Sequence, residues 1–168
     1  MSEQRYSFPV LDEIKQNGRA LSYTKGFSML PMLKENRDIS VLVAPPQKLS
    51  KGDVVLFVRP RRDNELVLHR IVKVVSPDVF IIRGDNTYLD EPVNREDIIA
   101  LLEGFFRKGK YRNCKTSKGY RVYTFAQLHL YFLRKFFLRT LRVAGAKIKN
   151  SVLHMNGFHL SDLFGKKR

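Results

Sequence analysis

The sequence predicts an α+β protein in which a mostly antiparallel β domain is followed by a basic helical C-terminal extension. Between residues 21 and 110, short β-branched and aromatic runs alternate with turns rich in Gly, Pro, Asn and Asp, which is typical of strands. Beyond residue 121, apolar residues recur at helical spacing instead. A length of 168 residues and a hydrophobic content of 43% suit one main domain with an appendage.

Residues 1–20 are expected to hold a short helix and the lead-in to the sheet. Three apolar residues share one face of the segment from Phe8 to Asn17, and Gly18 can end that helix. From Arg19, apolar and polar residues alternate as far as Gly26, which predicts the first strand.

The β domain is expected over residues 21–110. Ile98 to Phe106 is either a final strand or a helix capped by Asn94 to Asp97, and the local pattern leaves both open. Lys108 to Lys118 is polar and basic, so we expect it to be a linker. Apolar runs bounded by turn residues predict further strands over Asp38 to Ala44, Val54 to Val58, Glu65 to Val75 and Val79 to Arg83.

The C-terminal region, residues 111–168, is expected to be helical and amphipathic. On a helical wheel, the apolar residues between Phe125 and Val143 fill one broad side, with Lys and Arg along the opposite stripe. This pattern suits either packing on the β domain or insertion into a lipid interface.

Charge is concentrated in this C-terminal part of the chain. Residues 1–100 hold 15 Lys and Arg against 14 Asp and Glu, whereas residues 101–168 hold 16 against 2. The net charge of +15 therefore predicts an anionic partner for the last part only. That partner is a lipid surface, a nucleic acid or an acidic polypeptide.

No segment of the sequence is long and apolar enough to cross a bilayer. The longest candidate, Val122 to Leu133, has 12 residues, where a spanning helix needs about 20. The N-terminus carries acidic residues and no apolar run, so we expect no secretory signal. Cys114 is the single cysteine, which excludes an internal disulfide and fits a reducing compartment. We expect a cytoplasmic protein, either free or attached to the membrane periphery through residues 121–149.

Three polar residues lie in contexts that suit nucleophilic catalysis. Ser28 lies in GFSMLPML, His69 in LVLHRIV and Asp85 in IIRGDN. A serine hydroxyl needs a base to take its proton, a histidine titrates near neutral pH, and a carboxylate can orient the imidazole. Each residue alone has a structural explanation, as a turn serine, a buried strand histidine and a turn aspartate. Their order and contexts together indicate a nucleophile, a base and an orienting group.

Five segments resemble, in order, the motifs of the type I signal peptidase and LexA-like repressor peptidase superfamily. GFSMLPML resembles the nucleophile motif Gly-x-Ser-Met-x-Pro, through Gly26, Ser28, Met29 and Pro31. LSKGDVVLF and ELVLHRIVKVV are similar to the Gly-Asp-Val-Val strand and the general-base segment. IIRGDNTYLDEPV and REDIIALLEGFFRKGK are similar to the Gly-Asp-Asn motif and the closing segment. The resemblance covers roughly residues 20–110 and implies the β fold of that superfamily.

Three departures define the variant that the resemblance implies. Most bacterial signal peptidases and the repressors use a lysine base, whereas His69 is similar to the base of archaeal, endoplasmic-reticulum and sporulation-type enzymes. Gly26 stands where many signal peptidases have a serine, so backbone N–H groups around Gly26, Ser28 and Met29 are expected to receive the oxyanion. Signal peptidases usually have an N-terminal membrane helix, which we do not expect here.

The resemblance therefore implies a serine endopeptidase that cleaves a leader or signal-like peptide by acyl transfer, without a cofactor or metal ion. Ser28 is the expected nucleophile and His69 the expected base. Asp85 or Asp90 is expected to orient the imidazole, and Glu91 beside them is left open. The expected partners are a peptide or preprotein substrate and an anionic membrane surface.

Two alternatives belong to other functional classes. One is a non-catalytic peptide-binding or regulatory relative that keeps the fold. The other is a nucleic-acid-binding protein that uses the basic C-terminal region. Nucleic acid is the less favoured partner, because no helix-turn-helix pattern is evident in the sequence.

Overall fold

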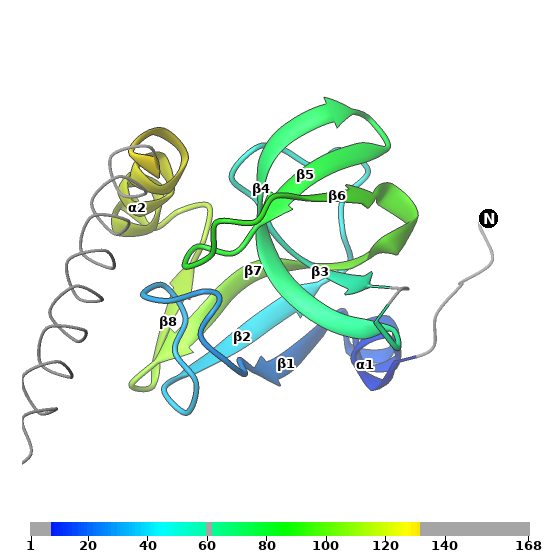
Figure 1. Ribbon diagram of the computed structural model, residues 1–168. Helices are drawn as coiled ribbons and strands as arrows, with labels where there is room; N and C mark the ends of the chain where they lie inside the picture. Colours follow the sequence, from blue (N-terminus) through cyan, green and yellow to red (C-terminus); the bar gives the residue numbers. More distant parts are fainter. Residues whose placement is uncertain (1–7, 60–61, 132–168) are drawn as a thin grey trace, which may run out of the picture. The chain divides into compact units, whose positions relative to one another are not determined.

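The computed structural model describes residues 8–59 and 62–131, and within them the chain has an α+β fold dominated by one antiparallel sheet (Figure 1). This described part contains eight strands, two α-helices and one short 3-10 helix. In chain order the elements are α1 (Pro9–Asn17), β1 (Arg19–Tyr23), β2 (Asp38–Val43), β3 (Val54–Arg59), β4 (Glu65–Ser76), β5 (Val79–Arg83), β6 (Glu91–Asn94), η1 (Arg95–Asp97), β7 (Ile98–Arg107), β8 (Lys110–Asn113) and α2 (Lys118–His129).

The sheet runs in the order β1-β2-β7-β3-β4-β5-β6, with β8 added beside β7, and each neighbouring pair is antiparallel. β7 comes late in the chain but lies in the middle of the sheet, between β2 and β3. In Figure 1 the β4–β5–β6 end of the sheet curls above the β1–β2 end, and α1 and α2 lie on opposite sides. This curvature brings segments that are distant in sequence to one cleft.

β3 shows how the sheet is held, because its apolar residues are all buried. Val54, Leu56 and Val58 belong to one apolar cluster, while Val55 and Phe57 belong to a second cluster. Alternate side chains of a strand point to opposite faces, so both faces of β3 are covered. A strand covered on both faces needs the continuous apolar run that the sequence shows. Burying each such side chain contributes roughly 1.5–3 kcal/mol.

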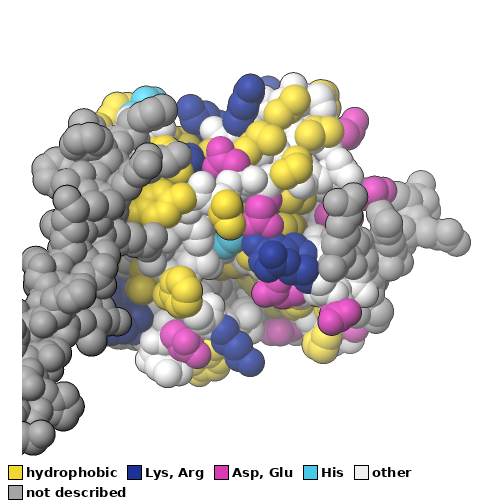
Figure 2. Space-filling view, viewed as in Figure 1, with side chains coloured by type: hydrophobic (Ala, Val, Ile, Leu, Met, Phe, Trp, Pro, Cys, Tyr) yellow, Lys and Arg dark blue, Asp and Glu magenta, His cyan; other side chains and the backbone are white. Residues whose placement is uncertain are grey.

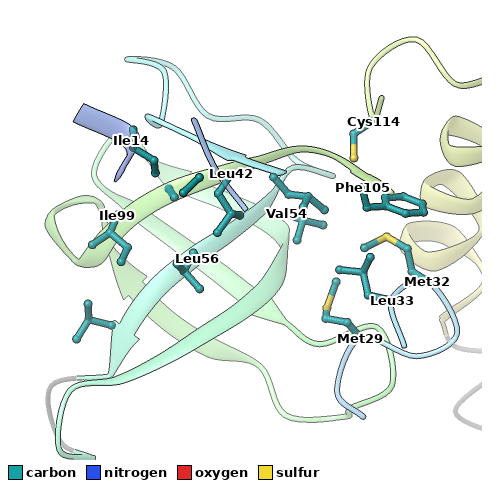
Figure 3. Close-up of a cluster of buried hydrophobic side chains, with 14 residues drawn as sticks. Ile14, Met29, Met32, Leu33, Leu42, Val54, Leu56, Ile99, Phe105 and Cys114 are labelled. Atoms are coloured by element: carbon teal, nitrogen blue, oxygen red, sulfur yellow. The ribbon is translucent and has the colours of Figure 1, made fainter. Parts of the chain in front are cut away.

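The first cluster also anchors the loop between β1 and β2. Met29, Met32 and Leu33 come from this loop and are buried in the same cluster as Phe105 of β7 (Figure 3). Methionine is flexible and fills irregular spaces between elements. The loop that carries Ser28 is therefore held by the hydrophobic core.

The N-terminal helix and the first five strands lie close to their predicted positions. α1 ends at Gly18, whose φ of 74° is left-handed and whose N–H donates to the Ile14 carbonyl at 2.8 Å. Ile98–Arg107, for which the pattern allows helix or strand, is strand β7, and it pairs with both β2 and β3. The predicted α+β class is confirmed for the described residues.

Two short strands escape the sequence-based prediction, and one predicted linker is wrong. β6 contains Pro92 and polar neighbours, so its pattern does not indicate a strand. It lies at an edge of the sheet, where proline is tolerated. Lys108 to Lys118 is not a linker, because β8 pairs with β7 through a tight turn at Lys108 and Gly109, both at positive φ.

The chain divides into two compact units, Met1–His129 and Leu130–Arg168. β8 and α2 belong to the same unit as the sheet. This unit therefore continues beyond residue 110, the predicted end of the β domain. α2 packs against the first cluster through Tyr120 and Tyr123.

Most of the amphipathic helix predicted over residues 121–149 lies outside the described residues, which end at Tyr131. Within residues 8–59 and 62–131, no helix combines the length and the apolar character needed to cross a bilayer.

Candidate active site

Ser28 lies on the loop that joins β1 to β2. Gly26 begins the turn with a φ of 75°, a left-handed conformation that glycine adopts without strain. Its amide donates to the Glu35 carboxylate at 3.1 Å, which links the start of the loop to its end. Met29 is only 1% exposed, whereas Ser28 is half-buried. The loop therefore holds Ser28 near the surface next to a buried anchor.

The turn after β5 holds the serine loop from the other side. Asn86 donates from its backbone N–H to the Ser28 carbonyl at 2.7 Å and from its side-chain amide to the Phe27 carbonyl at 3.2 Å. A methyl group at Gly84 would come within 2.8 Å of the Ser28 carbonyl oxygen and 2.9 Å of His69 Nε2. Any side chain at Gly84 would push these groups aside, so glycine lets this turn bring Ser28 and His69 together.

His69 is buried on β4 with one ring nitrogen that makes no hydrogen bond. The residue is 3% exposed and its ring centroid is 6.0 Å from that of Phe57. In the described part of the chain, Nδ1 has no hydrogen-bond partner, and Glu91 Oε1 lies 3.5 Å away. Burial lowers the pKa of His69 from 6.5 to about 4, although the Glu91 charge acts to raise it. The imidazole is therefore neutral near pH 7 and able to accept a proton.

Glu91, the first residue of β6, is the carboxylate that faces this imidazole. Arg59 Nε donates to Glu91 Oε2 at 2.6 Å, and Arg59 Nη2 donates to Oε1. Arg59 also donates to Glu65 at 3.0 Å. Burial alone would lower the pKa of Arg59, but its bonds to the two glutamates raise it, so the guanidinium stays charged. This bidentate contact between Arg59 and Glu91 fixes the plane of the Glu91 carboxylate. Its Oε1 then lies on the side of His69.

Asp85 and Asp90, the two predicted orienting groups, contact arginines instead. The two Asp85 oxygens accept from Arg70 at 2.7 Å each, and Tyr123 donates to the same carboxylate at 3.0 Å. Asp90 is paired with Arg83 at 3.3 Å, and its side chain is 53% exposed. Of the three carboxylates considered, Glu91 is the one paired with His69, whereas Asp85 and Asp90 are paired with arginines. The reason is alternation along β4: Arg70 follows the histidine, points to the opposite face and binds Asp85 there.

Arg70 also joins β4 to α2. Its Nη1 donates to the Gly52 carbonyl at 2.8 Å, to Thr124 at 3.0 Å and to Tyr120 at 3.1 Å. Burial would lower the pKa of Arg70, but the bonds to Asp85 raise it, so the charge is kept inside the fold. This network attaches α2 to the strand that carries the histidine.

The serine loop offers two backbone donors beside the hydroxyl. Among the described residues, the N–H groups of Ser28 and Met29 donate to no acceptor, whereas that of Gly26 is bonded to Glu35. Unpaired N–H groups next to a nucleophile are the donors that a developing oxyanion requires. Of the three predicted oxyanion positions, Ser28 and Met29 keep an available donor and Gly26 does not.

Ser28 and His69 line one cleft of about 630 Å³. Its walls come from the end of β1, the serine loop, the first half of β4 and the segment before β6. β4 pairs with β3 along its first half but with β5 only from Arg70 onward, so among the described strands residues 65–69 are paired along one edge only and have an unpaired edge. Within the described chain no hydrogen bond joins the Ser28 hydroxyl to His69; catalytic pairs often tighten only around substrate.

The sequence leaves the choice of Glu91 open and does not predict Arg59 as a residue of the site. Glu91 directly follows Asp90, so spacing does not separate them, and only the pairing of Glu91 with Ile82 across β5 and β6 decides which one faces inward. Arg59 ends a buried strand next to a polar, arginine-rich loop, where a solvated arginine is the usual reading. No local signal links Arg59 to Glu91.

The fold and this cleft define an α+β protein in which a serine, a buried neutral histidine and a glutamate gather at one groove. No protein-family model, curated protein or solved structure matches the chain. The resemblance to signal peptidases and LexA-like repressors therefore rests on the five sequence segments, and the activity of the protein is a proposal.

Proposed function

We propose that this protein is a serine endopeptidase of the signal peptidase and LexA-like type with a histidine base. The observation that carries the proposal is the state of His69. Its imidazole is buried and neutral, with Nδ1 facing Glu91 and Nε2 beside the serine loop in an open cleft. A buried nitrogen without a hydrogen bond costs on the order of 1–3 kcal/mol, so its retention favours a functional role.

In the proposed reaction, His69 Nε2 accepts the hydroxyl proton of Ser28 while Oγ attacks the scissile carbonyl carbon. The N–H groups of Ser28 and Met29 receive the oxyanion. The Glu91 carboxylate stabilises the His69 imidazolium by facing the Nδ1–H group of the ring. His69 then returns the proton to the leaving amine, which leaves an acyl ester on Ser28. Water hydrolyses this ester with His69 again acting as the base.

The substrate is proposed to bind as an extended strand. The unpaired edge of β4 at residues 65–69 runs along the cleft, and its backbone N–H and C=O groups are suited to pair with a peptide. Such pairing would hold the scissile bond in an extended conformation beside Ser28. A leader or signal-like peptide is the substrate class that the resemblance implies.

A fluorophosphonate probe tests the proposed nucleophile without a known substrate. We expect covalent labelling of the purified protein, located at Ser28 by mass spectrometry of its peptides. Ser28→Ala and His69→Gln should lose the label. Ser50→Ala should keep it, because Ser50 is an exposed serine that does not line the cleft. Equal labelling of wild type and Ser28→Ala, or a folded wild type that is never labelled, favours the non-catalytic alternative.

A second role, attachment to an anionic membrane surface, is proposed for the C-terminal region. The supporting observation is the outer face of α2, where Lys118, Arg121, Val122 and Phe125 follow helical spacing and are all exposed. Val122 is 69% exposed and Phe125 is 60% exposed. Cations next to exposed apolar side chains suit an anionic lipid interface, whereas phosphate backbones require only the cations.

Vesicle sedimentation of the full chain tests this second role. We expect binding to vesicles that contain phosphatidylglycerol, little binding to pure phosphatidylcholine, and a clear loss of binding in Phe125→Ser. Val75→Ser is the matched control, since Val75 is 54% exposed on β4. Unchanged binding of Phe125→Ser contradicts the proposal. Salt-sensitive binding of duplex DNA without vesicle binding would favour the nucleic-acid alternative.

A further inference from the structure

The cleft of the proposed active site is ringed by exposed hydrophobic side chains. Four separate segments contribute one each: Tyr23 is 69% exposed, Phe27 70%, Leu66 38% and Leu89 76%. On the face shown in Figure 2, hydrophobic side chains lie exposed between charged ones. Large apolar side chains that converge on one cleft are typical of a surface that binds an apolar partner.

Apolar and polar residues both line the cleft, and its charged residues balance. Leu42 and Leu56 line it and are 1% and 9% exposed. Two basic and two acidic residues line it as well, and Arg59 binds both of the acids, Glu65 and Glu91. The cleft therefore lacks a charge excess with which to select acidic or basic side chains.

We propose that this cleft selects extended peptides that carry large aliphatic or aromatic side chains within three residues of the scissile bond. The inference rests on the proposed peptidase function. A peptide paired with the free edge of β4 would direct alternate side chains toward the cleft floor and toward its rim. A cleft of about 630 Å³ has room for more than one large side chain. Alanine-sized side chains would leave the hydrophobic rim in water.

Cleavage-site profiling tests the inference. The purified full chain is incubated with a mixture of synthetic peptides in which all residue types are equally represented, and the cut sites are read by mass spectrometry. Large apolar residues should be enriched at one or more positions within three residues of the cut. For a matched peptide pair, replacing one such residue by serine should lower kcat/KM on the order of 10- to 100-fold.

A rim variant tests which side chains are responsible. Leu89→Ser changes an exposed side chain, so it should fold like the wild type and cut apolar peptides with kcat/KM reduced roughly fivefold or more. Val75→Ser is the control, because Val75 is similarly exposed but does not line the cleft. If Leu89→Ser cleaves apolar peptides with the same preference as the wild type, the exposed side chains around the cleft do not select the substrate.

The outcomes separate this inference from the proposed function. Cleavage that depends on Ser28 but shows no enrichment of large apolar residues overturns the inference and leaves the peptidase proposal standing. Cleavage that is absent, or that persists in Ser28→Ala, overturns both.

Discussion

His69 and Arg70 are neighbours on β4, both almost fully buried, yet their surroundings are opposite. Arg70 is 1% exposed, and its guanidinium donates to the Asp85 carboxylate, a backbone carbonyl and two hydroxyls. His69 is 3% exposed, and within residues 8–59 and 62–131 its Nδ1 has no hydrogen-bond partner, with Glu91 Oε1 at 3.5 Å. A buried polar group whose hydrogen-bond donors are all used typically has a structural role. A buried polar group that lacks a hydrogen bond more often has a functional role. Burial alone therefore does not separate the two.

The turn after β5 connects these two faces of β4. Asp85 binds Arg70 on one face, and Asn86 donates to the carbonyls of the serine loop beside the cleft. The Arg70 network therefore supports the serine loop of the proposed active site through the adjacent residues Asp85 and Asn86. Four predictions test this division, from the largest expected effect to the smallest.

The largest effect is expected for His69→Gln, which keeps a polar side chain but removes the base. Cleavage that depends on Ser28 should fall on the order of 10⁴-fold, about 5 kcal/mol of barrier. The free energy of unfolding at pH 7 should change by about 1 kcal/mol or less, since the imidazole makes few bonds that stabilise the fold. Peptide kinetics and urea unfolding measure the two effects. Retained cleavage would remove His69 from the mechanism.

Arg70→Met is expected to act on stability. It leaves Asp85 buried without its partner, so the free energy of unfolding should fall by about 3–5 kcal/mol. Arg121→Met, at an exposed position on α2, is the control and should change it by about 0.5 kcal/mol or less. The double variant Arg70→Met/Asp85→Leu should recover part of the loss. A loss below about 1 kcal/mol in Arg70→Met would contradict the structural role of the pair.

Acid should destabilise the protein through His69 but not through Arg70. The pKa of His69 is about 4 in the folded chain and 6.5 as its ordinary value, so the unfolded chain binds the proton first as pH falls. Stability should therefore decrease from about pH 6.5 down to pH 4, by on the order of 2–3 kcal/mol. Urea unfolding across this range should show a smaller decrease in His69→Gln. Equal pH dependence in both proteins would refute the assignment.

Glu91→Gln should have the smallest effect of the four. Its carboxylate is 3.5 Å from Nδ1 and shared with Arg59, so its loss should lower kcat/KM roughly 10- to 100-fold, about 1.4–2.7 kcal/mol. Glu91 acts to raise the pKa of His69, so the acidic limb of the pH–rate profile should move to lower pH. Asp90→Asn should leave kcat/KM and the acidic limb of the pH–rate profile unchanged. The reverse ranking of Glu91 and Asp90 would restore the orienting group predicted from sequence.

Much of the fold follows from local pattern. The end of α1 at Gly18 and the strands through β5 could be predicted, because turn residues and apolar runs mark their limits. β6 and β8 could not, because EPVN and KYRN are short and polar and form strands only through the partners beside them. The sequence pattern of Ile98–Arg107 fits either a helix or a strand. The segment is a strand because it lies between β2 and β3 in the sheet.

The candidate site divides in the same way. Ser28, His69 and the Gly-Asp-Asn turn are visible in the sequence, because each stands in a motif of a few residues that resembles a known family. The pairing of Glu91, rather than Asp85 or Asp90, with His69, and that of Arg59 with Glu91, came only from the fold. Ion pairs between distant strands depend on register and on which face a side chain points to, and a shift of one residue reverses that face. Local chemistry thus determines which groups are present, and tertiary pairing decides which of them meet.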